Sequence, residues 1–155
     1  MSVIQNIAII GVIGVVLYMG TRAAMPRGIR NKNPLNIEYN KANDWEGQTG
    51  TDGRFATFSD SLYGIRAGAK LISNYMSIQN KYSVIDILER FAPSTENHTA
   101  AYAEFVAGQL GVSISQRLEQ SHIPAMVAAM IKFENGIQPY SAEHIQQACK
   151  LAGVV

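Results

Sequence analysis

One carboxyl group stands where acid–base chemistry could be carried out. In the segment HIPAMVAAMIKFENG, Glu134 follows Met130 by four residues and Val127 by seven, so it shares the apolar face of a helix that Gly136 should end. Partial desolvation and the negative end of the helix dipole would both favour its neutral form. A carboxyl group protonated near neutral pH can serve as a general acid on a glycosidic oxygen. The same pattern also fits a solvated helix end, or an ion pair with an arginine.

Other reactive side chains are placed less favourably for catalysis. The three histidines, His98, His122 and His144, lack the H-x-x-x-H or H-x-x-E-H spacing of zinc enzymes, so we expect no metal ion. Cys149 is the only cysteine, which excludes an intrachain disulfide and Cys-rich zinc modules. The sequence has no glycine loop of the kind that cradles phosphates, and we expect no cofactor.

Turn formers and apolar periodicity predict the elements that position these groups. Residues 26–58 are rich in Asn, Gly, Asp and Thr, and TDGRF is typical of a turn that leads into a strand, which favours a small β-hairpin region. Beyond it the apolar residues recur at helical spacing. The sequence predicts helices from a cap at Ser59 or Asp60 to about 76, from a cap at Ser83 to Pro93, over 97–110, over 124–134, and from a cap at Ser141 to Gly153.

Much of the apolar content lies at the N-terminus. Of the 155 residues, 47% are hydrophobic and 16% are charged, and none of residues 1–21 carries a charge. As a helix, residues 3–20 would extend about 27 Å at ~1.5 Å per residue, just enough to cross a bilayer core. We expect a membrane anchor and linker over residues 1–25 and a folded domain over residues 26–155. A cleaved secretory signal is the alternative, although no Lys or Arg precedes the apolar run.

The net charge bears on nucleic-acid binding, and the positions of the basic residues bear on membrane topology. The net charge of +1 gives no electrostatic argument for a nucleic-acid partner. The basic residues Arg22, Arg27, Arg30 and Lys32 all follow the apolar run, and the positive-inside rule would then keep the domain in the cytoplasm.

Several segments, taken in order, resemble a known family of enzymes. They are PRGIRNKNPLNI, then W-x-G-Q, DGRFATFSDSLYGIRAGAKLISNY, APSTENHTAAYAEFVAGQLGV and MIKFENGIQPYS, and they cover nearly all of residues 26–150. Their content, order and spacing resemble phage virion-associated peptidoglycan-degrading proteins of the lytic-transglycosylase-like family. The resemblance implies a lysozyme-like α+β domain, mainly α with a small β-hairpin region. With the anchor, one N-terminal transmembrane helix would precede it.

The resemblance also implies site residues. FENGIQPYS is similar to the E-S-G-x-x-P motif in which the catalytic Glu of such enzymes ends a helix, which points to Glu134, with Asn135 where Ser is usual. Here this helix follows the segments that it normally precedes, an order that indicates a circular permutation placing Glu134 against NPLNI. Glu38 is the reserve candidate for the catalytic residue. The expected substrate-binding residues, each of which also has a structural interpretation as a turn former or packing residue, are Asn33, Asn36, Trp45, Gln48, Tyr102 and Tyr140.

The implied activity is that of a lytic transglycosylase on the β-1,4 bond between N-acetylmuramic acid and N-acetylglucosamine. Glu134 would act first as acid and then as base. A hydrolase would need a second acid about 5–9.5 Å away, which Asp44, Glu46 or Asp52 could supply. A catalytically silent glycan-binding or structural virion protein and an endopeptidase on the same fold are the alternatives.

The expected partners and location follow from the anchor together with the resemblance. The partners are peptidoglycan strands, a lipid bilayer through residues 3–20, and other virion proteins. We expect the protein in a virion's internal membrane or the host cell envelope, opening the wall as the phage genome enters.

Overall fold

The computed structural model describes residues 25–93 and 95–155 of the chain, without the side chains of Glu96 and Asn97. The predicted anchor at residues 3–20 lies outside these described residues. Within them, no helix is both long enough and apolar enough to cross a membrane.

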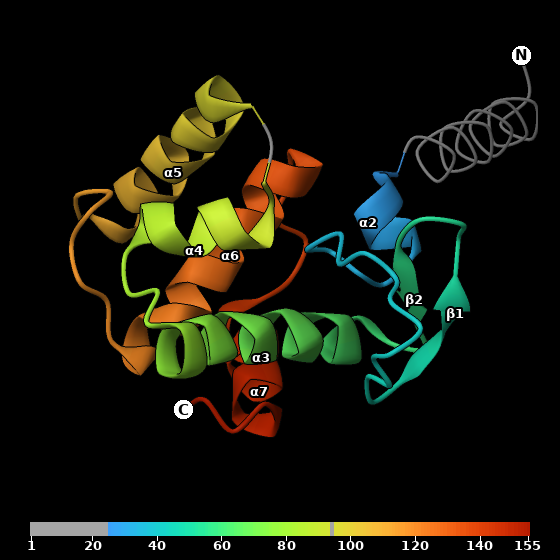
Figure 1. Cartoon of the computed structure of the whole chain (residues 1–155). Helices are drawn as coiled ribbons and strands as arrows, with labels where there is room; N and C mark the ends of the chain where they lie inside the picture. Colours follow the sequence, from blue (N-terminus) through green and yellow to red (C-terminus); the bar gives the residue numbers. More distant parts are fainter. Residues whose placement is uncertain (1–24, 94) are drawn as a thin grey trace, which may run out of the picture.

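The described chain is mainly helical and has one small antiparallel sheet (Figure 1). In chain order the elements are α2 (Arg27–Arg30), β1 (Gln48–Thr51), β2 (Ala56–Phe58), α3 (Ser61–Gln79), α4 (Val84–Phe91), α5 (Glu96–Leu110), the 3-10 helix η1 (Gln120–His122), α6 (Ile123–Asn135) and α7 (Ala142–Leu151). This confirms the mainly α fold and the small β-hairpin region that the sequence predicts.

Local side-chain bonds set the helix starts, as predicted. The carboxylate of Asp60 accepts a hydrogen bond from Leu62 N at the start of α3. Ser83 and Ser141 cap α4 and α7 in the same way. Each cap satisfies a backbone N–H that has no partner inside its helix. The predicted helix ends are also confirmed for α5 and α6, since glycines with left-handed backbone angles follow both helices.

The hairpin forms around the predicted TDGRF turn. Strands β1 and β2 pair antiparallel with Thr51 opposite Ala56, and an irregularity in register lies between Gln48 and Gly50. A further bridge joins Glu38 to Phe55, so the segment before the hairpin runs alongside it. Figure 1 shows the hairpin and α2 together at one end of α3, with α5 toward the other.

Helix α6 is central to the core. It packs against α2, α3, α5 and α7, and its side chains Met126, Val127, Met130 and Ile131 are all fully buried. Burying aliphatic side chains of this size stabilises the fold by about 1.5–3 kcal/mol each. The C-terminal end of α6, where Glu134 lies, is therefore held on a rigid element.

Glycines on α3 let the chain before the hairpin approach closely. A Cβ on Gly64 would collide with the backbone oxygen of Lys32, and a Cβ on Gly68 would collide with Leu35. Gly64 and Gly68 are one helical turn apart and share a face of α3. This face fixes the height of residues 32–35 above the helix, and so the position of Asn36 that follows.

We predict that Gly64→Ala lowers the free energy of unfolding by about 1–3 kcal/mol, because the added methyl group forces the Lys32 backbone off α3. Gly108→Ala on α5 is the matched control. No atom lies within 4 Å of the Cβ it would add, so it should be neutral or stabilising by up to about 1 kcal/mol. Urea unfolding of the two variants measures both effects, and equal stability of the variants would contradict the packing argument.

Candidate functional site

Glu134 lies half-buried in the last turn of α6. Its Oε2 accepts a hydrogen bond of 3.1 Å from Nδ2 of Asn36, a residue 98 positions earlier in the chain. Asn36 belongs to the NPLNI segment, so the end of the Glu134 helix does lie against that segment. The bond fixes the rotation of the carboxyl group, since the Asn36 amide holds one of its two oxygens.

The phenol of Tyr102, from α5, is close enough to Glu134 for the charge of that carboxylate to act on it. Tyr102 is only 1% exposed, and its ring stacks on Phe133 with centroids 4.1 Å apart and planes 10° apart. Burial and then the negative charge of Glu134 raise the pKa of Tyr102 well above its usual value. The hydroxyl therefore stays protonated. Its oxygen is buried and has no hydrogen-bond partner among the described residues.

Asn36 has an unusual backbone conformation. Its φ angle is 50°, in the left-handed region that asparagine tolerates better than most residues. Its N–H donates to the Asn33 carbonyl at 2.9 Å, which closes a turn over NPLN. The turn aims the Asn36 side chain at Glu134.

Asn33 holds this turn in place from beneath. It is fully buried. Its Nδ2 donates to the carbonyls of Ile37 and Ala56, and its Oδ1 accepts from Ile37 N. These bonds tie the turn to β2. The side-chain amide of Asn33 thus binds backbone groups of the protein. Asn33 positions Asn36 and does not present its own side chain to a ligand.

Asn135 ties the end of α6 to the same turn. Its Nδ2 donates to the carbonyls of Pro34 at 2.7 Å and Ile131 at 2.8 Å. Gly28 of α2 lies against the side-chain oxygens of both Asn135 and Asn36, and a Cβ there would come within 2.7 Å and 2.8 Å of them. Glycine is needed at this contact, and α2 becomes part of the support for the site.

Glu38 and two of the three acids considered for hydrolysis, Glu46 and Asp52, have arginine partners. Glu38 is exposed and pairs with Arg54 at 3.0 Å. Glu46 pairs with Arg66 at 3.1 Å. Asp44 is exposed, in the loop before the hairpin.

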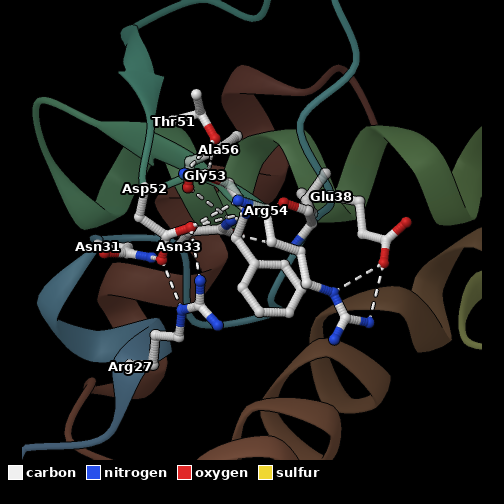
Figure 2. A network of polar contacts seen from close by, with 11 residues as sticks. Arg27, Asn31, Asn33, Glu38, Thr51, Asp52, Gly53, Arg54 and Ala56 are labelled. Atoms are coloured by element: carbon white, nitrogen blue, oxygen red, sulfur yellow. Dashed lines mark hydrogen bonds and ion pairs between the residues drawn. The ribbon is translucent and has the colours of Figure 1, made fainter.

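Asp52 is the centre of the network in Figure 2. Both of its oxygens bind Arg27, Asn31 donates a further bond of 2.6 Å, and the backbone N–H groups of Arg54 and Phe55 also donate to it. These donors, Arg27 first, hold the pKa of Asp52 well below its usual range. Asp52 therefore joins the hairpin turn to α2 and has no proton to give.

Two guanidinium groups enclose the Phe55 ring beside this network. The Arg27 guanidinium lies 4.7 Å from the ring centroid and that of Arg54 lies 4.8 Å from it. Such contacts are worth about 0.5–1 kcal/mol at exposed sites. Nothing in the spacing of residues predicted this arrangement, apart from the presence of Asp and Arg around the turn.

Hydrogen bonds and ring contacts place the remaining predicted binding residues with other partners or with none. Trp45 and Gln48 belong to the hairpin region, where the buried Trp45 Nε1 and Gln48 Oε1 have no hydrogen-bond partner among the described residues. The Tyr140 ring stacks on His144, at 5.5 Å between centroids. Asn36, by a hydrogen bond, and Tyr102, by the effect of charge on its phenol, are the predicted residues with an interaction to Glu134 in the described part of the chain.

Sequence reasoning missed one feature beside the site, a group of aromatic rings. Phe133 precedes Glu134, and its ring meets not only Tyr102 but also His98 and Phe105 of α5. The signal was present, because residues 98, 102 and 105 recur at the helical spacing that puts them on one face.

Neither a thiol nor a metal ion offers an evident alternative chemistry in the described part of the chain. Cys149 is buried, and burial raises the pKa of its thiol to about 11. The thiolate that a nucleophile needs is therefore scarce at neutral pH. In residues 25–93 and 95–155, no group of three or more His, Cys, Asp or Glu side chains could hold a metal ion.

Comparison with known proteins places the chain among phage proteins. No protein-family model matches it. It is 36% identical over 139 residues to Protein P5 of Pseudoalteromonas phage PM2, a match that covers 87% of each chain. The chain belongs to the family of this phage protein. The name of the relative specifies no activity.

We predict that Asp52→Asn changes how stability depends on pH. Because the folded-state pKa of Asp52 is depressed, its contribution is complete above the unfolded pKa of about 3.9 and is lost as the pH falls below that value. The variant should be less stable than the wild type at pH 6, and the difference should shrink at pH 3. Thermal unfolding at the two pH values measures this. Asp44→Asn, at an exposed carboxylate, is the control, and a constant difference for Asp52→Asn would contradict the prediction.

We also predict that Asn36→Asp makes the fold sensitive to pH. Two carboxyl groups at hydrogen-bonding distance cannot both ionise cheaply, so the folded variant binds a proton that the unfolded chain releases. Relative to the wild type, its free energy of unfolding should fall by about 1 kcal/mol or more between pH 4 and pH 7. Asn36→Gly keeps the left-handed backbone and removes the amide, and it should show no such slope in urea unfolding. Parallel pH profiles for the two variants would contradict the geometry.

Proposed function

We propose that this phage protein cleaves the glycan strands of peptidoglycan as a lytic transglycosylase on a lysozyme-like domain, with Glu134 as its single general acid and base. The observation that carries the proposal is the setting of Glu134. It ends the central helix α6, half-buried, with one oxygen held by Asn36 and the buried Tyr102 phenol close by. An acid in a fixed orientation on a rigid element is what general acid catalysis requires.

The reaction needs one carboxyl group. Glu134 donates its proton to the glycosidic oxygen as the bond from that oxygen to C1 of the muramic acid breaks. The resulting carboxylate then takes the proton of the C6 hydroxyl of the same sugar, whose oxygen forms a new bond to C1. The products are a free 4-hydroxyl on N-acetylglucosamine and a 1,6-anhydro end on the muramic acid. Glu134 is protonated again, and no water is consumed.

Neighbouring charges support this route over hydrolysis. A hydrolase needs a second carboxylate to activate water or to form a covalent intermediate. Asp52 accepts bonds from Arg27, Asn31 and its own turn, and Glu46 is paired with Arg66. Asn36, which touches Glu134 directly, is an amide and cannot act as a base. The arrangement around Glu134 therefore favours one acid working alone.

We place this activity at a membrane. The charge-free residues 3–20 are proposed to anchor the domain in a lipid bilayer, in the internal membrane of the virion or in the host envelope. The relative is a phage protein, and we propose that this chain acts on the cell wall as the genome enters. The positive-inside rule would instead keep the domain in the cytoplasm. A virion membrane need not present the domain on the side to which the host inserted it, and Arg27 is bound by Asp52 within the fold.

We predict that Glu134→Gln lowers the cleavage of purified peptidoglycan by about 10²–10⁴-fold. Glutamine has the same shape and can still accept the bond from Asn36, so the fold should be kept. Glu104→Gln, at an exposed position of α5, is the matched control and should retain wild-type activity. Mass spectrometry of the wild-type products should find 1,6-anhydro ends. Full activity of Glu134→Gln would show that the site is misassigned, and ends carrying an added water would make the protein a hydrolase.

A further inference from the structure

We propose that His98 contacts the substrate and binds an amino sugar of the glycan strand beside the bond that Glu134 cleaves. This inference rests on the proposed function and adds to it a specific contact. His98 lies in the first turn of α5 and is exposed.

The His98 ring is fixed by the two aromatic residues that adjoin Glu134. Its centroid lies 5.8 Å from that of Phe133, with planes 61° apart, and 6.5 Å from that of Tyr102, with planes 64° apart. Phe133 directly precedes Glu134 in α6, and the Glu134 charge acts on the Tyr102 phenol. His98 therefore contacts two residues that adjoin Glu134, and its own side chain is exposed.

The other two histidines have clear structural roles, and His98 does not. His122 exchanges hydrogen bonds with Glu119 in a capping box before α6. His144 bonds Ser61 at 3.0 Å. The ring nitrogens of His98 form no hydrogen bond in the described part of the chain.

An imidazole in this setting suits an amino sugar. A pyranose ring offers a face of C–H groups that packs on aromatic rings, and its hydroxyl and acetamido groups can pair with a ring nitrogen. The contacts with Phe133 and Tyr102 restrict the imidazole before the ligand arrives, which lowers the entropy lost on binding. The same rings connect the bound sugar to the residue that does the chemistry.

Binding can be measured in the full chain carrying Glu134→Gln, which holds substrate without turnover. The probe is a soluble tetrasaccharide of alternating N-acetylglucosamine and N-acetylmuramic acid, followed by isothermal titration calorimetry. Adding His98→Ala should weaken its affinity about tenfold. In the active protein, His98→Ala should raise KM by about the same factor and change kcat less than about threefold. His98→Phe separates stacking, which it keeps, from hydrogen bonding, which it removes.

His122→Ala is the matched control, because it removes an imidazole at the N-terminal end of α6. At ~1.5 Å per residue, this end lies about 20 Å along the helix from Glu134. It should leave affinity and KM unchanged. If the affinity of His98→Ala for the tetrasaccharide is within twofold of that of its parent, or if His98→Ala lowers kcat at constant KM, His98 is not a sugar contact. In that case, anhydro products from the wild type would still support the proposed function. If the wild type forms no anhydro products and Glu134→Gln binds no tetrasaccharide, the proposed function is wrong and this inference falls with it.

Discussion

The structure depends on the close packing of one short segment, residues 32–36, between two helices. Gly64 on α3 admits its backbone from one side, and Gly28 on α2 admits the amides of Asn36 and Asn135 from another. A methyl group at either glycine would lie closer to these atoms than van der Waals contact allows. Because the segment cannot shift without moving both helices, the amide of Asn36 meets the carboxyl group of Glu134 at a fixed place.

Glu134 differs from three other carboxyl groups of the molecule in the kind of side chain that binds it. Asp52, Glu38 and Glu46 are each paired with an arginine, whereas Glu134 is held by a neutral amide. An ion pair with arginine keeps a carboxyl group ionised, as the depressed pKa of Asp52 demonstrates. A neutral donor orients a carboxyl group without supplying a full opposite charge. The contrast explains how several acids near one end of the molecule can have different roles.

Sequence reasoning succeeded where the determining interactions are local. The caps and ends of the helices follow from spacing. Spacing put Glu134 on the apolar face of its helix but left a solvated helix end and an ion pair open, and the pairing of this helix with NPLNI was reached through motif resemblance. It could not assign Asn33, because the carbonyls that hold its amide come from a residue four positions on and from β2, 23 positions away. It could not foresee that Asp52 would form an ion pair with Arg27, since the two residues are 25 positions apart and meet only where the hairpin turn contacts α2. Polar residues in loops have too many possible partners for spacing to choose among them.

Helix α2 joins whatever precedes residue 25 to the rest of the molecule, and it is clamped to the hairpin by Arg27 and to α6 by Gly28. A mechanical force applied to the chain from that end would act first on these two contacts, and Gly28 lies directly against the side chain of Asn36. The opposite terminus follows α7 and is remote from α2 in Figure 1. Reporter fusions or surface immobilisation at Val155 would therefore leave the Glu134 neighbourhood unstrained, whereas the same attachments made just before α2 would pull on it.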